Sequence, residues 1–136
     1  LDPNSGSLLG PDDRKLIDRG AAIVALDCSW KNLGESMSEM SANTSLISRT
    51  LPLVLAANPV SWGKPGRLST AEALCVSLVL CGRIEQAKSI ISPFGFGEQF
   101  LSLNHEPLLA YSQATSNEEL ALMQWDFFDM PESTDD

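Results

Sequence analysis

Two short runs of apolar residues stand out against longer stretches in which apolar and polar residues mix. The runs AAIVAL, residues 21–26, and LPLVLAA, residues 51–57, are continuous rather than alternating. Such runs are typical of strands that are buried on both faces, and they predict an α/β fold with a parallel sheet covered by helices. The second strand should end at Asn58-Pro59, because proline cannot donate to a strand ladder.

Capping and breaking residues predict the helices around these strands. Pro11 begins a first helix and Gly20 ends it. Ser69 and Glu72 form the S-x-x-E capping box of a strongly apolar helix. Three further helices are predicted at residues 83–91, 94–104 and 117–129, the last with Ser116 and Glu119 as a second capping box.

The chain of 136 residues fits a single domain, and its formal charge of −9 is unevenly distributed. Residues 117–136 hold seven of the 18 acidic residues and no Lys or Arg. Residues 49–88 include five basic residues and two acidic ones. The middle of the chain is therefore mildly basic, so the total charge does not exclude a nucleic-acid partner. We expect residues 1–129 to form the domain and residues 130–136 a disordered acidic tail.

The cysteines and the apolar runs indicate the cellular setting. The three cysteines form no CxxC pair, and an odd number cannot all pair within the chain, which favours a reduced, intracellular protein. No apolar run in these 136 residues approaches the roughly 18 residues of a membrane span, and we expect no signal peptide. Because the chain begins LDPNSG without methionine, we expect an amino-terminal portion to precede it.

The segment AANPVSWGKPGR, residues 56–67, connects the second strand to the apolar helix. Open α/β sheets bind ligands at the carboxyl ends of their strands, where this segment lies. An ordinary connection that uses proline and glycine as turn residues is the alternative. The length of twelve residues favours a functional loop.

Four motifs in order, LDCSW, LPLVLAANPVSWGKPGRLSTAEAL, FGFGEQFLSLN and LLAYSQATSNEEL, resemble the aminocarboxypropyltransferases of small-subunit ribosomal RNA. The similarity runs from Leu1 to about Phe128. It implies a SPOUT-like domain with a C-terminal trefoil knot and a helical C-terminus. It also implies transfer of the 3-amino-3-carboxypropyl group of S-adenosylmethionine to N3 of an N1-methylpseudouridine during ribosome biogenesis, with release of methylthioadenosine.

The resemblance also assigns site residues. Asp27 and Trp30 match the acid and the tryptophan beside the transferred group; a turn cap and a core aromatic are the structural alternatives. The cofactor positions are Leu1, Pro3, Leu26, Leu51, Gly66 and Thr70. From their charge and place near the loop, Arg49, Lys64 and Arg67 are the candidate RNA contacts. The family motif D-x-x-x-C-[ST]-G is absent from these 136 residues.

We expect a monomer that needs no metal and acts in the cytoplasm, or also in the nucleus of a eukaryote, on small-subunit rRNA or the pre-ribosomal small subunit. His105, the only histidine, has no cluster of ligand residues around it in the sequence. Two other functions stay open: a SPOUT-type RNA methyltransferase, and a cofactor-free module of ribosome assembly. The reaction product distinguishes the first of these, and cofactor binding the second.

Overall fold

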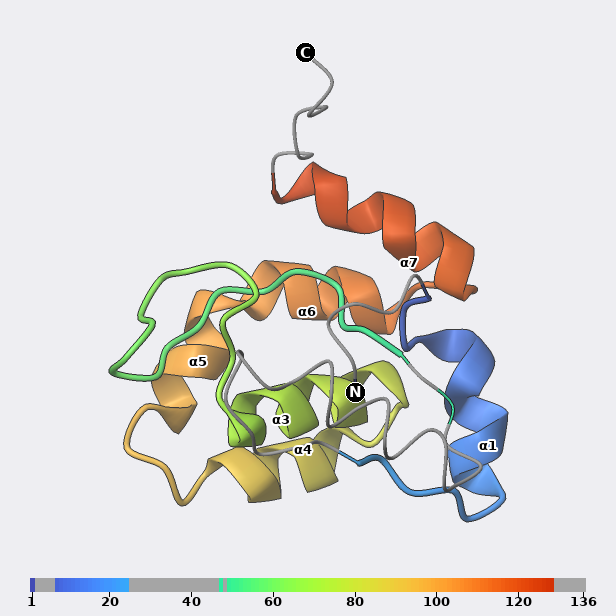
Figure 1. Cartoon of the computed structure of the whole chain (residues 1–136), viewed down its shortest axis with the longest axis horizontal. Coiled ribbons are helices and arrows are strands. Elements are labelled where there is room, and N and C mark those ends of the chain that lie inside the picture. The colour runs from blue at the N-terminus through green and yellow to red at the C-terminus, as the bar shows by residue number, and fades with distance from the viewer. Residues whose placement is uncertain (2–6, 25–46, 48, 129–136) are drawn as a thin grey trace, which may run out of the picture.

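The computed structural model describes residues 1, 7–24, 47 and 49–128. Helices are the regular elements of this part of the chain (Figure 1). They are the 3₁₀ helix η1 (Pro11–Asp13), α1 (Arg14–Asp18), α3 (Thr70–Leu80), α4 (Ile84–Ile91), α5 (Gly97–Leu103), α6 (His105–Ser112), α7 (Asn117–Met123) and the 3₁₀ helix η3 (Gln124–Asp126). The predicted helices are thus confirmed, with the last one ending before residue 129.

The capping boxes that define two of these helices differ in completeness. At the start of α3 the Ser69 hydroxyl accepts from Glu72 N at 3.3 Å, and the Glu72 carboxylate accepts from Ser69 N at 2.9 Å. At the start of α7 the Ser116 hydroxyl accepts from Glu119 N at 3.1 Å. The Glu119 carboxylate accepts instead from the Thr115 hydroxyl at 2.6 Å. Both hydrogen bonds of the first capping box are therefore confirmed. Of the second box only the bond to the serine hydroxyl is confirmed.

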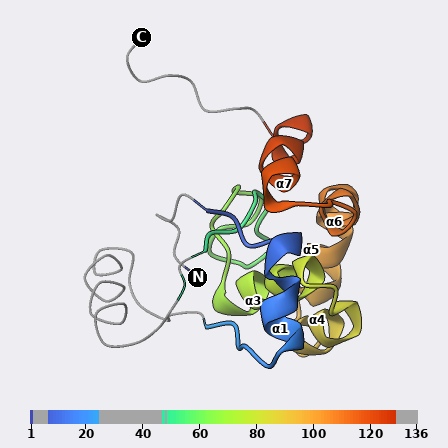
Figure 2. The same ribbon diagram turned by 90° about the vertical axis from the view of Figure 1, so that its right-hand side faces the viewer.

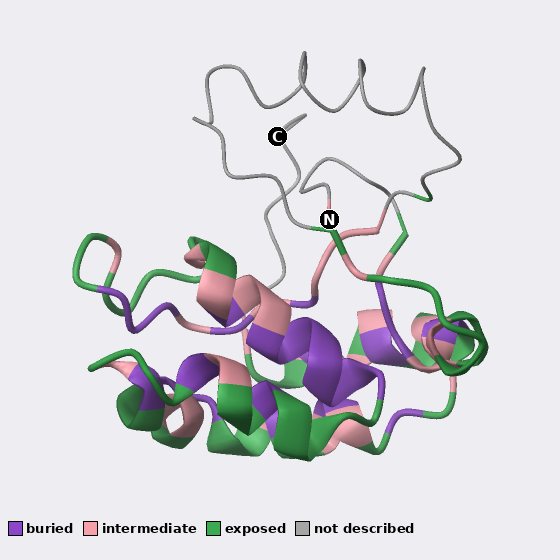
Figure 3. Cartoon of the chain, turned by 90° about the horizontal axis from the view of Figure 1, so that it is seen from below, coloured by how far each residue is buried: buried purple, intermediate pink, exposed green. Residues whose placement is uncertain are grey.

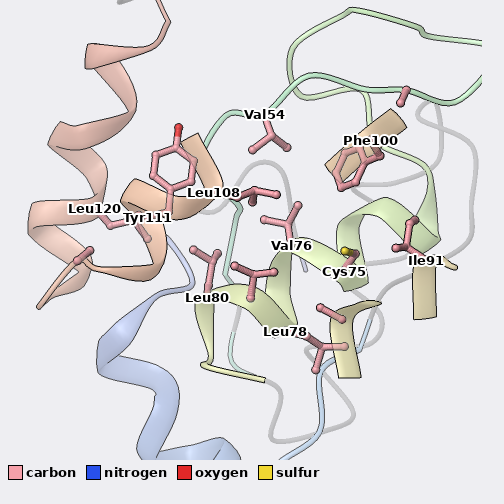
Figure 4. Packing of buried hydrophobic residues seen from close by; sticks show 14 residues of the cluster. Val54, Cys75, Val76, Leu78, Leu80, Ile91, Phe100, Leu108, Tyr111 and Leu120 are labelled. Atoms are coloured by element: carbon pink, nitrogen blue, oxygen red, sulfur yellow. The ribbon is translucent and has the colours of Figure 1, made fainter. Parts of the chain in front are cut away.

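Helix α3 lies at the centre of the core. Residues 75–80 are all buried, as expected for a helix that is apolar on nearly every side. Helices α4 and α6 contact it, and α7 packs on α6 (Figures 1 and 2). Figure 4 shows side chains from α3, α5 and α6 meeting Val54 of the segment before α3. The largest of these buried side chains are Tyr111 and Phe100.

The segment 51–57 is extended, but in the described chain it belongs to no sheet. In the described chain there is one isolated parallel bridge just before it, between Leu8 and Thr50, and one isolated antiparallel bridge within it, between Leu55 and Pro65. Its even-numbered side chains are buried and its odd-numbered ones are half-buried up to residue 55. The expectation that both faces are fully buried is therefore wrong at this strand, because one face lies closer to solvent.

The backbone of this extended segment is satisfied largely by side chains from the helices on one edge. Alternate residues of an extended chain direct their backbone N–H and C=O groups to the same edge, and here these residues are Leu53, Leu55 and Ala57. The bonds on this edge are Leu53 N to Gln124 Oε1 (3.1 Å), Tyr111 OH to Leu53 O (2.7 Å), Leu55 N to Asn104 Oδ1 (2.6 Å), Asn104 Nδ2 to Leu55 O (2.8 Å) and Ala57 N to Glu72 Oε2 (2.7 Å). Side chains thus occupy the place that a neighbouring strand would take.

The opposite edge is covered by the loop that follows. Gly63 N donates to Ala56 O at 2.7 Å, and Ala56 N donates to Lys64 O at 3.1 Å. Gly66 N donates to Val54 O at 3.0 Å. Gly63 and Gly66 have φ angles of 77° and 73°, a region that favours glycine, so the loop can fold back on the segment without backbone strain.

The predicted strand at residues 21–26 is not found over residues 21–24. These residues form no strand, and all but Ile23 are exposed. Val24 O accepts a hydrogen bond from the Leu1 ammonium group at 2.6 Å. An apolar run becomes a buried strand only where other elements cover it, and no strand of the described chain pairs with this one. Residues 25 and 26 lie outside the described residues.

The last described residues dock on α6. The ring of Phe127 meets the ring of Tyr111 edge-on, with centroids 6.1 Å apart, and Trp125 is half-buried. These aromatic contacts attach the last helix to the core. None of the described helices is long and apolar enough to cross a membrane.

Arg14 joins the ends of three helices. Its Nε donates to Leu80 O at 3.0 Å and its Nη2 to Ser112 O at 3.1 Å. Both carbonyls lie at helix C-termini, where peptide oxygens lack intrahelical partners and a positive charge is favourable. The guanidinium therefore links α1 to the ends of α3 and α6.

We predict that Arg14→Ala lowers the free energy of unfolding by about 2 kcal/mol, because two carbonyls lose a charged donor. Urea denaturation measures this change. Arg19→Ala is the matched control, since Arg19 is exposed just after α1, and it should change stability by less than about 0.5 kcal/mol. Equal losses in the two variants would contradict the role of Arg14 as a clamp.

Candidate functional site

The candidate site comprises the end of the extended segment, the loop of residues 58–67 and the first turn of α3. In Figure 1 this loop projects at the end of the molecule opposite α1. Figure 3 shows that much of it is exposed, in contrast to the buried residues 56–58 that lead into it. The loop therefore combines an anchored base with a surface that is open to solvent.

A buried carboxylate fixes both ends of the loop. Glu72 is fully buried, and its Oε2 accepts from Ala57 N at 2.7 Å. Its Oε1 accepts from Asn58 Nδ2 at 2.6 Å, and from Ser69 N and Ser69 Oγ at 2.9 Å each. A buried charge is tolerated when it is fully hydrogen-bonded, and here four donors surround it. Glu72 therefore ties the residues before the loop to the residue that begins α3.

Asn58 extends this network into the loop. Besides its bond to Glu72, its Nδ2 donates to Arg67 O at 3.2 Å. Its Oδ1 accepts from Ser61 N at 3.0 Å. One side chain thus contacts the beginning and the end of the loop, which restricts the conformations that the loop can adopt.

Three of the predicted cofactor residues, Leu51, Gly66 and Thr70, lie in the described chain. Gly66 lies beside the extended segment, since a Cβ built on it would be 3.5 Å from Leu53 Cδ2. Thr70 is exposed at the first position of α3, and Leu51 is half-buried two residues before Leu53. The loop therefore brings Gly66 back beside Leu53, and the assignment of these three residues to the cofactor stays a prediction.

The exposed side of the extended segment combines apolar side chains with an unbonded stretch of backbone. The half-buried leucines at positions 51, 53 and 55 provide an apolar face for a base. Side chains bond the backbone of residues 53, 55 and 57 along one edge of the segment. On that edge the Leu51 backbone has no hydrogen-bond partner among the described residues. Backbone N–H and C=O groups require partners when they become buried, so a ligand there gains both apolar and polar contacts.

The other predicted cofactor and catalytic residues lie elsewhere or outside the described chain. Leu1 is half-buried and its ammonium group contacts Val24 O. Pro3, Leu26, Asp27 and Trp30 lie outside the described residues. Their assignments stay predictions.

The three candidate RNA contacts differ in their surroundings. Lys64 and Arg67 are exposed on the loop. Arg49 pairs with Asp13 at 3.2 Å, with side-chain exposures of 27% and 7%. Because its guanidinium contacts an almost buried carboxylate, Arg49 has a structural role that the sequence did not indicate. Its assignment to RNA stays a prediction, and Lys64 and Arg67 are the better-placed pair.

Neither thiol of α3 and its C-cap suits nucleophilic catalysis. Burial, with the nearby Glu72 carboxylate, raises the pKa of the Cys75 thiol to about 11. Burial also raises the pKa of Cys81. Both thiols are therefore protonated at neutral pH, whereas the thiolate is the reactive form. Among the described residues, no group of three or more His, Cys, Asp and Glu side chains is arranged to hold a metal ion.

The comparisons with known proteins identify the family. The family profile named "Ribosome biogenesis protein, C-terminal" matches residues 1–128. The chain belongs to the ribosomal RNA aminocarboxypropyltransferase family. It is 38% identical over 133 residues to the 16S rRNA aminocarboxypropyltransferase of Halobacterium salinarum, covering 97% of this chain and 74% of that protein. It is 42% identical over 127 residues to the protein of the same name from Methanothermobacter thermautotrophicus, covering 93% of this chain and 73% of the relative.

A solved structure of the family supports the fold. The SAM-dependent rRNA:acp-transferase Tsr3 from Vulcanisaeta distributa matches with a TM-score of 0.72 and 31% identity. The match covers 90% of this chain, and the chain spans 65% of the length of that protein. It confirms the SPOUT-like fold class that the sequence motifs implied.

We predict that Glu72→Gln weakens the anchoring of the loop. The carboxylate accepts with both oxygens, whereas the Gln amide has one acceptor oxygen and an NH2 group that would face a donor such as Ala57 N. We expect a loss of about 1–3 kcal/mol in the free energy of unfolding, the usual cost of an unsatisfied buried group. Urea denaturation measures this loss, and hydrogen exchange of the Ala57 amide should become faster.

The control for this variant is Glu85→Gln. Glu85 lies in the first turn of α4, with its side chain 92% exposed and 3.8 Å from Lys88 Nζ. An exposed pair of this kind contributes little to stability. If the two variants lose the same stability and Ala57 exchange is unchanged, the Glu72 network does not anchor the loop.

Proposed function

We propose that this chain transfers the 3-amino-3-carboxypropyl group of S-adenosylmethionine to a modified uridine of small-subunit rRNA. The observation that carries this proposal is the 38–42% identity, over more than nine-tenths of the chain, to proteins named 16S rRNA aminocarboxypropyltransferase. The solved relative is named as SAM-dependent, which supports the same cofactor. We further propose N3 of an N1-methylpseudouridine as the acceptor atom.

In this proposal the loop and its neighbours hold the adenosine part of the cofactor. The backbone at Leu51, Gly66 and Thr70 contacts it, and Leu1, Pro3 and Leu26 complete the site. When bound, the cofactor supplies a carbon that its sulfonium activates toward nucleophiles. The chain therefore has mainly to position the reactants, which can lower a barrier by about 7–11 kcal/mol. The network around Glu72 contributes by fixing the ends of the loop.

Asp27 and Trp30 are proposed to act at the transferred group. A carboxylate pairs with the ammonium of an amino acid group, and an indole face attracts a cation. Both interactions would present the aminocarboxypropyl carbon, rather than the methyl carbon, to the uridine. These two residues follow directly on the predicted first strand.

The finer features of the fold and the setting are part of the same proposal. They are the parallel sheet, the C-terminal trefoil knot, a monomeric state, the absence of a metal requirement and a cytoplasmic site of action. The family membership supports the sheet and the knot. The described segment at residues 51–57, with the loop folded back on it, is compatible with a strand that the remaining chain joins.

Analysis of the reaction product tests this function. With small-subunit rRNA that carries the modified uridine, we expect methylthioadenosine, unchanged in excess chelator. Asp27→Ala and Trp30→Ala should reduce turnover far more than thermal stability. Adenosylhomocysteine as product would identify a methyltransferase instead, and absence of both products together with absence of cofactor binding would identify a non-catalytic assembly module.

A second experiment tests the RNA-facing surface. We predict that the double variant Lys64→Ala, Arg67→Ala binds single-stranded RNA more weakly and lowers the slope of log affinity against log salt by about 1.4, at about 0.7 for each lost phosphate contact. Cofactor affinity should stay nearly unchanged. Lys15→Ala with Arg19→Ala is the matched control, because both residues are exposed at α1. An unaltered slope in the loop variant would exclude the loop as an RNA contact.

A further inference from the structure

The tip of the loop presents two apolar side chains to solvent. Val60 is 89% exposed and Trp62 is 50% exposed. The aromatic ring pairs of the described residues are Phe94 with Phe96 and Tyr111 with Phe127, so the indole of Trp62 is not stacked on another ring there. Tryptophan is highly buried on average, and a half-exposed indole with no ring partner is available for an intermolecular contact.

The backbone that carries Trp62 is held by hydrogen bonds on both sides. Ser61 N donates to Asn58 Oδ1 at 3.0 Å, and Gly63 N donates to Ala56 O at 2.7 Å. Lys64 N donates to Ser61 O at 3.0 Å and closes the turn around the indole. A ligand that stacks on Trp62 would therefore find the loop already ordered, which reduces the entropy lost on binding.

The charges around Trp62 are of one sign. Residues 58–67 include Lys64 and Arg67 and no acidic residue, although the chain as a whole carries −9. Both basic side chains are exposed, and the nearby Glu72 carboxylate is buried. An exposed aromatic ring among exposed cations is the combination by which proteins bind single-stranded nucleic acid, with bases on the ring and phosphates on the cations.

We propose that Trp62 stacks on an unpaired base of the RNA substrate while Lys64 and Arg67 contact the adjacent phosphates. This rests on the proposed function for the nature of the ligand. Trp62 lies on the same loop as Gly66, which is proposed to hold the cofactor. RNA fits better than an apolar protein partner, because two exposed cations and no acidic residue share the loop with the ring, and phosphates supply the matching negative charge.

Binding of a single-stranded oligouridylate of about ten nucleotides tests the stacking. We expect Trp62→Ala to weaken binding by roughly five- to a hundredfold with an unchanged salt slope, since the phosphate contacts remain. Trp62→Phe should retain most of the affinity. Trp62→Leu should lose as much as Trp62→Ala, because leucine keeps apolar bulk without an aromatic face.

Phe94→Ala is the matched control, since Phe94 is 44% exposed outside the loop and should leave RNA affinity unchanged. Wild-type affinity in Trp62→Ala overturns the proposal, and wild-type affinity in Trp62→Leu replaces it with an apolar contact. Formation of methylthioadenosine tests the proposed function separately. If that product forms and Trp62→Ala still binds normally, only the stacking fails. If no product forms and Trp62→Ala loses RNA affinity, only the function fails.

Discussion

The need to satisfy the backbone of one buried apolar segment governs this structure. Residues 51–57 are too apolar to remain in water, yet burying their N–H and C=O groups without partners would cost more than the burial gains. In the described chain the solution is a set of side chains from three helices and from the junction between α5 and α6. Glu72, Asn104, Tyr111 and Gln124 each bond the segment at 2.6–3.1 Å. Through these bonds the helices are packed and oriented around Val54.

The same constraint connects the fold to the candidate site. Glu72 satisfies Ala57 at the end of the segment and also caps the helix that follows the loop. A single buried carboxylate therefore sets the distance between the two anchor points of the loop. The loop in turn covers the opposite edge of the segment through Gly63, Lys64 and Gly66. The core thus determines the conformation of the base of the loop, whereas the tip of the loop is exposed to solvent.

The distribution of charge complements this arrangement. The chain as a whole carries a formal charge of −9, whereas residues 58–67 hold two basic residues and no acidic one. Lys64 and Arg67 are exposed, whereas Arg49 pairs with Asp13 and Arg14 holds helix ends. Basic residues of the same type therefore have either a structural role or a place on the surface. The carboxylates and carbonyls that lie beside each residue decide which.

The sequence by itself determined the features that depend on near neighbours. The Ser69–Glu72 box was predictable because a cap joins residues three positions apart, and Pro11 and Gly20 marked the ends of the first helix. The motifs that imply the family were also visible as continuous stretches. Only the tertiary structure decided contacts between distant residues: the second role of Glu72 at Ala57, the pairing of Arg49 with Asp13 over 36 positions, and the bonds of Asn104 and Gln124 to the extended segment. The exposure of residues 21–24 belongs to the same class, since burial of an apolar run depends on which elements cover it, and no local pattern specifies those elements.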